Sequence, residues 1–138
     1  MDKLDPQQRS ANMARVRGKD TAPEMKVRRI AHAMGLRYRL HRKDLPGRPD
    51  LVFPRHRLVV FVHGCFWHRH EACRRATIPA TRPEFWEAKF EATKARDARQ
   101  IGLLEAAGWR VVILWECELE EEAVATALRS ATSAVQLA

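Results

Sequence analysis

Apolar positions follow two different periods along the chain, and each change of period marks a predicted element. Thr21-Ala22-Pro23-Glu24 has the form of a capping box, and the apolar spacing after it predicts a helix over about 22–34 that ends at Gly35. Residues 36–40 alternate with period two, residues 50–53 follow a Pro-Gly-Arg-Pro loop, and residues 58–62 are a continuous apolar run. We therefore expect three strands, the third of them buried.

The second half of the chain predicts longer elements. Thr81-Arg82-Pro83-Glu84 is a second capping box, and it predicts a long helix that runs to about Ala107 and stops at Gly108. Residues 109–115 read as another buried strand, and an amphipathic helix is expected from Glu118 onward. This order predicts an α/β fold in which a central mixed sheet is flanked by helices. With 138 residues, the chain fits a single domain over 1–138.

The segment between His63 and Pro83 follows neither period, so something other than core packing must order it. Cys65, His70 and Cys73 lie close together in this segment, and Cys117 follows the last predicted strand, where the sheet would carry it back to the loop. Four nitrogen and sulfur ligands form a closed, structural zinc site. The alternative is a set of free buried thiols, since small apolar cysteines are often buried.

The charge distribution indicates a polyanionic partner. Lys and Arg outnumber Asp and Glu 25 to 17 over the whole chain, and 24 to 12 through Arg110, so the acidic excess is confined to the C-terminal end. Such a basic body is expected of a nucleic-acid-binding protein, although a merely soluble basic surface is the alternative. The N-terminus lacks the pattern of a secretory signal, and no apolar run approaches the ~20 residues of a membrane span. We therefore expect no membrane partner and a cytoplasmic protein.

Carboxylate and imidazole side chains are predicted to meet at one edge of the sheet. Asp50 starts one strand and His63 ends the next, and such a carboxylate suits Mg²⁺. His68 lies between the candidate zinc ligands and is a candidate general base. Asp97 lies among basic helix residues, where it is either a surface ion-pair partner or a carboxylate that orients a catalytic histidine.

Two adjacent aromatic pairs occur in and just after the irregular segment. Core packing is the expectation for Phe85 of the pair Phe85-Trp86. The pair Phe66-Trp67 lies in the loop, where it is less easily buried and can wedge between bases.

Several stretches together resemble one enzyme family. They are Arg9-Ser-Ala-Asn-Met13, Asp20-Thr-Ala-Pro-Glu24, Leu45-Pro-Gly-Arg-Pro-Asp50, Phe61-Val-His-Gly-Cys-Phe-Trp-His68, Pro79-Ala-Thr-Arg82, Glu84-Phe-Trp86 and Gly108-Trp-Arg-Val111. In this order, over about residues 9 to 118, they resemble the very short patch repair (Vsr) DNA mismatch endonucleases.

The resemblance implies a restriction-endonuclease-like fold and a nick in one DNA strand, 5′ to the thymine of a T·G mismatch left by deamination of 5-methylcytosine. It implies that Asp50 carries Mg²⁺ with the backbone carbonyl of Val62, and that His68 is the general base supported by Asp97. His63 and Glu24 would lie nearby, although Glu24 also completes a capping box, which is a structural role. The implied zinc ligands are Cys65, His70, Cys73 and Cys117.

The resemblance also implies how duplex DNA is engaged. Met13, Phe66 and Trp67 would wedge beside the mismatch, with Trp86 at the DNA and residues 1–20 as a DNA-contacting segment. A monomer is implied, while repair-protein partners stay open. Two alternatives are a zinc-stapled module that binds distorted duplex without cutting it, and a nuclease of this fold that acts on another base lesion.

Overall fold

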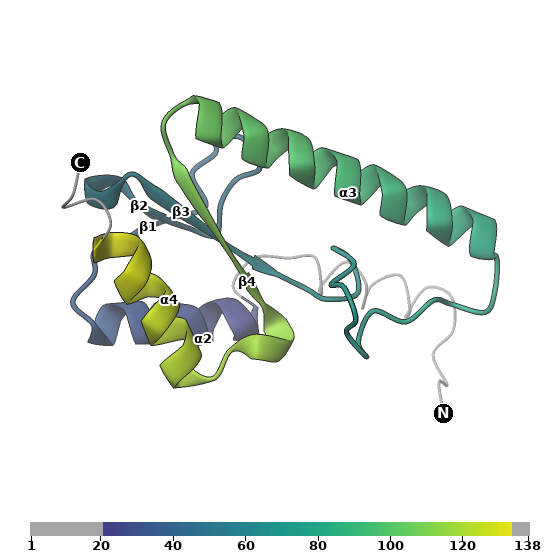
Figure 1. The fold of residues 1–138 in the computed structure, drawn as a ribbon, viewed down its shortest axis with the longest axis horizontal. Helices are drawn as coiled ribbons and strands as arrows, with labels where there is room; N and C mark the ends of the chain where they lie inside the picture. The colour runs from purple at the N-terminus through teal and green to yellow at the C-terminus, as the bar shows by residue number, and fades with distance from the viewer. Residues whose placement is uncertain (1–20, 134–138) are drawn as a thin grey trace.

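A computed structural model of the protein describes residues 21–133, which form a four-stranded sheet flanked by helices (Figure 1). The elements are α2 (Ala22–Ala33), β1 (Arg39–Leu40), β2 (Leu51–Phe53), β3 (Leu58–His63), α3 (Pro83–Ala106), β4 (Arg110–Trp115) and α4 (Glu121–Ser133), with short 3₁₀ turns at Pro54–His56 and Glu116–Glu118. This confirms the predicted order of helices and strands. No helix in the described part of the chain is long and apolar enough to cross a membrane.

The sheet is mixed, with strand order β1-β2-β3-β4. β1, β2 and β3 pair antiparallel, whereas β3 and β4 are parallel because α3 forms the crossover between them. Since β2 and β3 run in opposite directions, the start of β2 and the end of β3 meet at one end of the sheet. Asp50 and His63 therefore come to the same end, as the sequence predicts.

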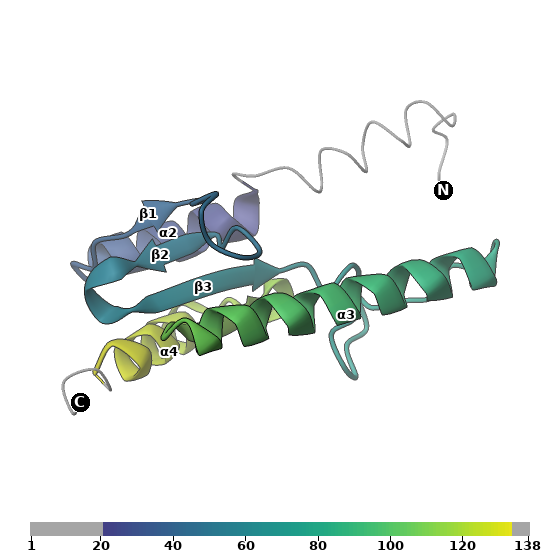
Figure 2. The same cartoon turned by 90° about the horizontal axis from the view of Figure 1, so that it is seen from above.

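Helices cover both faces of the sheet (Figures 1 and 2). Leu51, Phe53 and Leu58 belong to the core beneath α2 and α4, while Val52 and Val59 belong to a smaller core beneath α3. Alternate residues of β2 and β3 thus face opposite cores, which explains why these strands read as continuous apolar runs. Figure 2 shows α3 running well past the end of β3, so its N-terminal half covers the irregular loop rather than the sheet.

Two strand predictions are wrong in detail. The strand predicted over 36–40 shrinks to Arg39–Leu40, and both of these residues are exposed at the edge of the sheet. The strand predicted to be buried at 109–115 lies at the opposite edge, and within β4 only Leu114 is buried. An edge strand has a neighbour on one side only, so its apolar sequence does not guarantee burial.

The two predicted capping boxes have different outcomes. At α2, Thr21 Oγ1 accepts the Glu24 N–H at 3.5 Å, and Gly35 follows with φ +78°. At α3, the N-cap is Arg82 in a left-handed conformation, with no side-chain cap, so the prediction for Thr81 is wrong. Pro83 in the first turn of α3 and the end of this helix before Gly108 are as predicted. The C-terminal helix, predicted from Glu118, begins only at Glu121, because the Glu116–Glu118 turn intervenes.

Candidate active site

A groove of about 1110 Å³ opens at the end of the sheet where β2 begins and β3 ends. Every residue proposed for catalysis from the sequence lines this groove: Glu24 from α2, Asp50 before β2, His63 from β3, His68 from the loop and Asp97 from α3. Asp50 and His68 therefore lie on the same side of the molecule. The carboxylate and imidazole side chains that were predicted to meet are therefore gathered in one groove.

Asp50 is held at the groove by the neighbouring strand. Its Oδ2 accepts the backbone N–H of Val62 at 2.6 Å. Burial, together with the negative charge of Glu24, raises the pKa of Asp50 to about 6, while the Val62 amide opposes the shift. Two carboxylates held together in a partly dehydrated groove favour a bound cation. The carbonyl of Val62 as a metal ligand stays a prediction.

The Glu24 carboxylate makes contacts that are separate from helix capping. The cap uses its backbone N–H, whereas its buried carboxylate is bonded elsewhere: Oε2 lies 3.1 Å from Arg28 Nη2 and 3.0 Å from His41 Nε2. His41 Nε2 is also 4.0 Å from Asp50 Oδ1. Ligand atoms from Glu24, His41 and Asp50 all lie within 4.8 Å of one another, so the three side chains are placed to hold a metal ion.

His68 is oriented by a carboxylate from α3. Its Nδ1 lies 2.6 Å from Asp97 Oδ2, so an ionised Asp97 accepts the Nδ1 proton and leaves Nε2 with a free lone pair. The interpretation of Asp97 as a surface ion-pair partner is therefore wrong. It contacts the loop histidine, and its side chain is only 14% exposed.

His63 stacks against His68. The two imidazole rings are nearly parallel, with centroids 3.7 Å apart and an interplanar angle of 8°. Burial, and then the neighbouring His68, lower the pKa of His63 to about 3, so this ring stays neutral. Its buried Nδ1 has no hydrogen-bond partner within residues 21–133. The neutral His63 ring thus packs directly behind His68 at the groove.

A second cluster lies next to the groove and gathers the four predicted zinc ligands. Ligand atoms of Cys65, His70, Cys73 and Cys117 lie within 4.8 Å of one another. Zinc–ligand bonds of ordinary length put sulfur atoms about 3.8 Å apart, and sulfur and nitrogen about 3.6 Å apart, in a tetrahedron. The separation is 3.6 Å between the sulfurs of Cys73 and Cys117, and 3.3 Å between Cys117 Sγ and His70 Nδ1. The donor set and its spacing fit a tetrahedral metal ion.

The surroundings of the cluster also suit a metal. Burial raises the pKa of Cys65 to about 12, so this thiol needs a cation beside it to become a thiolate. His70 stacks on Trp115 at 4.2 Å, and its Nε2 lies 3.7 Å from Glu118 Oε1. A carboxylate behind a histidine ligand is a common support at metal sites.

The predicted DNA wedge residues form an aromatic cluster where the loop meets the start of α3. The ring of Phe66 lies 5.1 Å from that of Trp67 and 5.9 Å from that of Trp86. Phe85, for which core packing was expected, is 47% exposed, so that prediction is wrong. The first turn of α3 projects beyond the sheet, and its residues belong to neither of the two described hydrophobic cores. Met13 and the segment 1–20 lie outside the described residues.

Some groups at the site escape sequence analysis. His41 reaches the carboxylates of Glu24 and Asp50 because β1 pairs with β2 so that Leu40 lies opposite Leu51, which places residue 41 beside Asp50. Arg69 donates to the carbonyls of Phe66, Ala76 and Thr77 and lies 3.9 Å from the ring centroid of Phe90. The only sequence signal for His41 was its place at the end of an alternating run, and Arg69 gave none.

Comparison with known proteins identifies the family. The family model described as DNA mismatch endonuclease Vsr matches residues 1–75. The chain is 53% identical over 120 residues to the Type II nicking enzyme V.XorIIP of Xanthomonas oryzae pv. oryzae, covering 87% of this chain and 88% of that relative. The chain belongs to the Vsr family. This Vsr-family protein is also 45% identical over 118 residues to DNA mismatch endonuclease Vsr of Escherichia coli, covering 86% and 75% of the two chains.

The fold agrees with this assignment. The catalytic domain of the homing endonuclease I-Bth0305I superposes with a TM-score of 0.59 at 18% identity, covering 84% of this chain and 98% of that domain. The predicted restriction-endonuclease-like fold is thereby confirmed. As a Vsr-family member, the protein is a DNA endonuclease, and the non-cutting alternative is set aside.

Proposed function

We propose that this Vsr-family protein hydrolyses one strand of a duplex, 5′ to the thymine of a T·G mismatch left by deamination of 5-methylcytosine, in a Mg²⁺-dependent reaction. The observation that carries the proposal is the groove in which the His68–Asp97 pair and the Asp50–Glu24 carboxylates line a single space. One polypeptide supplies all four side chains, which supports action as a monomer. The thiols of the second cluster suit the reducing cytoplasm.

The carboxylates of Asp50 and Glu24 fit a hard divalent cation, with the Val62 carbonyl as a further oxygen ligand. A bound Mg²⁺ would supply charge neutralisation for the scissile phosphate. Asp50 lies at a fixed position through its bond to the Val62 amide, and Arg28 holds the Glu24 carboxylate. The protein thus offers an oriented, negatively charged cradle.

His68 is the proposed general base. Asp97 holds the Nδ1 proton, so Nε2 can take a proton from a water molecule in the groove. The water oxygen then forms a bond to phosphorus in line with the leaving 3′ oxygen, whose bond to phosphorus breaks, and solvent protonates that oxygen. His63, stacked on His68 and kept neutral by burial, helps to hold the His68 ring at the groove.

The aromatic cluster is the proposed reader of the lesion. A mismatched pair costs less to unstack than a Watson–Crick pair, so rings inserted beside it select the weaker step. Phe66, Trp67 and Trp86 are partly exposed at one end of the groove region, and Trp67 lines the groove itself. Met13 would join them from the N-terminal segment. Membership of a family of DNA mismatch endonucleases supports this choice of substrate.

Zinc at Cys65, His70, Cys73 and Cys117 is proposed as a structural ion, since four protein ligands leave no position for substrate. Two of these ligands flank Phe66, Trp67 and His68 in the sequence. A metal bound there fixes both the proposed wedge and the proposed base relative to the groove.

The deciding experiment is a nicking panel with Mg²⁺ on otherwise identical duplexes that contain T·G, other mismatches or no mismatch. We expect cutting of the T·G strand alone, and Asp50→Ala should abolish it while zinc content and folding are retained. Asp44→Ala is the matched control, because this carboxylate pairs with Arg42 on the surface and does not line the groove. Equal cutting of matched duplex, or an undiminished rate in D50A, contradicts the proposal. Preference for another lesion would assign the same chemistry to a different substrate.

A further inference from the structure

His41 lies beside two carboxylates of the active-site groove in an uncommon backbone conformation. It follows β1 directly, and its φ of +46° lies in the left-handed region. For a residue with a side chain this conformation is strained. The conformation aims the imidazole at two carboxylates: Nε2 is 3.0 Å from Glu24 Oε2 and 4.0 Å from Asp50 Oδ1. Strained residues of this kind cluster at functional sites.

Charge balance argues against a simple ion-pair role for His41. Arg28 already contacts the same oxygen of Glu24 at 3.1 Å, so that carboxylate has its cationic partner. With a neutral imidazole, the set of Glu24, Asp50 and Arg28 retains one negative charge. A divalent cation would turn this into one positive charge, which a phosphodiester neutralises. A neutral His41 imidazole can therefore bind the cation through its nitrogen, whereas a protonated one would add a positive charge to those of Arg28 and the cation.

We propose that His41 is a third protein ligand of the active-site cation, beside Glu24 and Asp50. Ligands at ordinary bond lengths around an octahedral ion are separated by about 3.0 Å when adjacent and about 4.2 Å when opposite. The two separations measured from His41 Nε2, 3.0 and 4.0 Å, fall in this range. The inference rests on the proposed function, since it places the cation at Asp50.

A nitrogen ligand from His41 would change which divalent cation the site prefers. Mg²⁺ prefers oxygen ligands, whereas imidazole suits transition metals, so a site with one histidine favours Mn²⁺ over Mg²⁺ more than an all-oxygen site does. His41→Gln offers an amide group in place of the ring nitrogen. It should therefore weaken Mn²⁺ binding while affecting Mg²⁺ less.

The test measures binding to the zinc-loaded full-length protein without DNA. Free Mn²⁺ is followed by electron paramagnetic resonance, and Mg²⁺ affinity is obtained by competition. We expect H41Q to weaken Mn²⁺ binding at least about 10-fold, the loss that even a supporting residue of a metal site causes, and to weaken Mg²⁺ binding clearly less. His32→Gln is the matched control, an exposed histidine on α2 outside the groove, and should change neither affinity. Equal affinities of H41Q and the unaltered protein for Mn²⁺ would overturn the inference.

A second measurement does not depend on the folding of H41Q. Electron spin echo modulation of bound Mn²⁺ in the unaltered protein should show a directly coordinated imidazole nitrogen, and this signal should persist in His63→Gln and His68→Gln. Its absence, or its loss in either variant, would overturn the assignment to His41. Asp50→Asn separates the two hypotheses. If D50N keeps Mn²⁺ binding and nicking, the proposed function fails, whereas a failure confined to H41Q leaves it intact.

Discussion

Asp97 is the residue whose single contact most directly affects the proposed chemistry. Replacing it with Asn keeps the size of the side chain but removes the carboxylate that fixes the Nδ1 proton of His68. We expect the nicking rate of D97N to fall by about 10²–10⁴-fold, the usual contribution of a positioned acid or base. Affinity for the T·G duplex should stay nearly unchanged, because Asp97 positions the base rather than the DNA. Single-turnover nicking and fluorescence anisotropy measure the two quantities.

Glu91→Gln is the control for this substitution. Glu91 lies on the same helix, its side chain is 75% exposed, and it pairs only with Lys94 among the interactions described. Its rate should match that of the unaltered protein. Nitrogen chemical shifts of the His68 ring should reveal a changed tautomer in D97N alone. A rate loss that comes entirely from weaker DNA binding would reject the positioning role.

At the scale of elements, the loop between β3 and α3 is expected to depend on a metal bound by the cysteine cluster. This loop has turns but no helix or strand. Cys73→Ser removes one of the four ligands of the candidate zinc site, three of which the loop supplies. We expect the loss of one equivalent of zinc, faster proteolysis within 64–82 and loss of nicking, because His68 is then no longer held at the groove. Metal analysis, limited proteolysis and the nicking assay report the three effects.

Glu71→Gln tests whether any change in this loop has the same result. Glu71 lies between the ligands but is exposed and outside the cluster. It should keep zinc, protease resistance and activity. Removal of zinc that leaves both resistance and activity unchanged would show that the loop is ordered by packing instead.

The attachment of α3 to the sheet depends on very few side chains. Leu104 is fully buried beside Val52, Val59 and Trp109, whereas its neighbour Leu103 is 53% exposed. Leu104→Ala should lower the free energy of unfolding by about 2–5 kcal/mol, since it removes buried methyl groups and leaves a cavity. Leu103→Ala should change it by less than about 0.5 kcal/mol. Urea unfolding of both variants makes the comparison, and equal losses would contradict the packing described.

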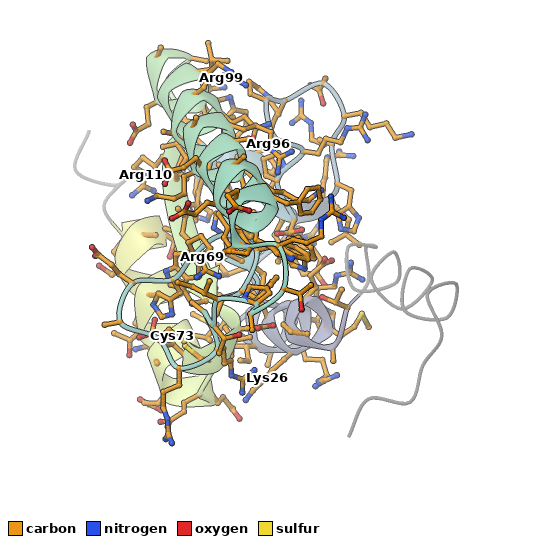
Figure 3. All side chains as sticks on the ribbon, turned by 90° about the vertical axis from the view of Figure 1, so that its right-hand side faces the viewer. Lys26, Arg69, Cys73, Arg96, Arg99 and Arg110 are labelled. Atoms are coloured by element: carbon orange, nitrogen blue, oxygen red, sulfur yellow. The ribbon has the colours of Figure 1, made fainter. Side chains whose placement is uncertain are left out.

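For the whole molecule, electrostatics should govern the affinity for DNA but not its selectivity. The chain carries a net charge of +8, and Arg96 and Arg99 line the groove from α3. Figure 3 shows both arginines on α3, with Arg69 in the loop below the helix. Each phosphate contact that is lost should make the slope of log affinity against log salt shallower by about 0.9.

Arg99→Gln should therefore bind matched and mismatched duplexes more weakly by the same factor, because phosphate contacts carry no sequence information. Anisotropy titrations at several salt concentrations measure the slopes. Arg129→Gln on α4, an exposed residue on the other side of the sheet, should leave the slope unchanged. An unchanged slope in R99Q, or a loss restricted to the mismatched duplex, would show that Arg99 does not act through the phosphate backbone.

Local patterns in the sequence determined much of this protein. Helix ends, the apolar runs of β2 and β3 and the spacing of the cysteines depend on neighbouring residues, so they predicted the element order and the metal-binding cluster. The pairing of Asp50 with the end of β3 followed from strand direction alone. The resemblance of the chain to the Vsr family extended the predicted site to Asp97, whose neighbours in the sequence are typical of a surface residue.

Only the tertiary structure decided the features that depend on distant segments. The register of β1 against β2 brings His41 to Glu24 and Asp50, and the position of β4 at the sheet edge leaves it half-buried. The overhang of α3 exposes Phe85 and places Asp97 against His68. Side-chain environment is set by whatever the fold packs nearby. A pattern confined to one segment cannot contain that information, because the packing partners lie tens of residues away along the chain.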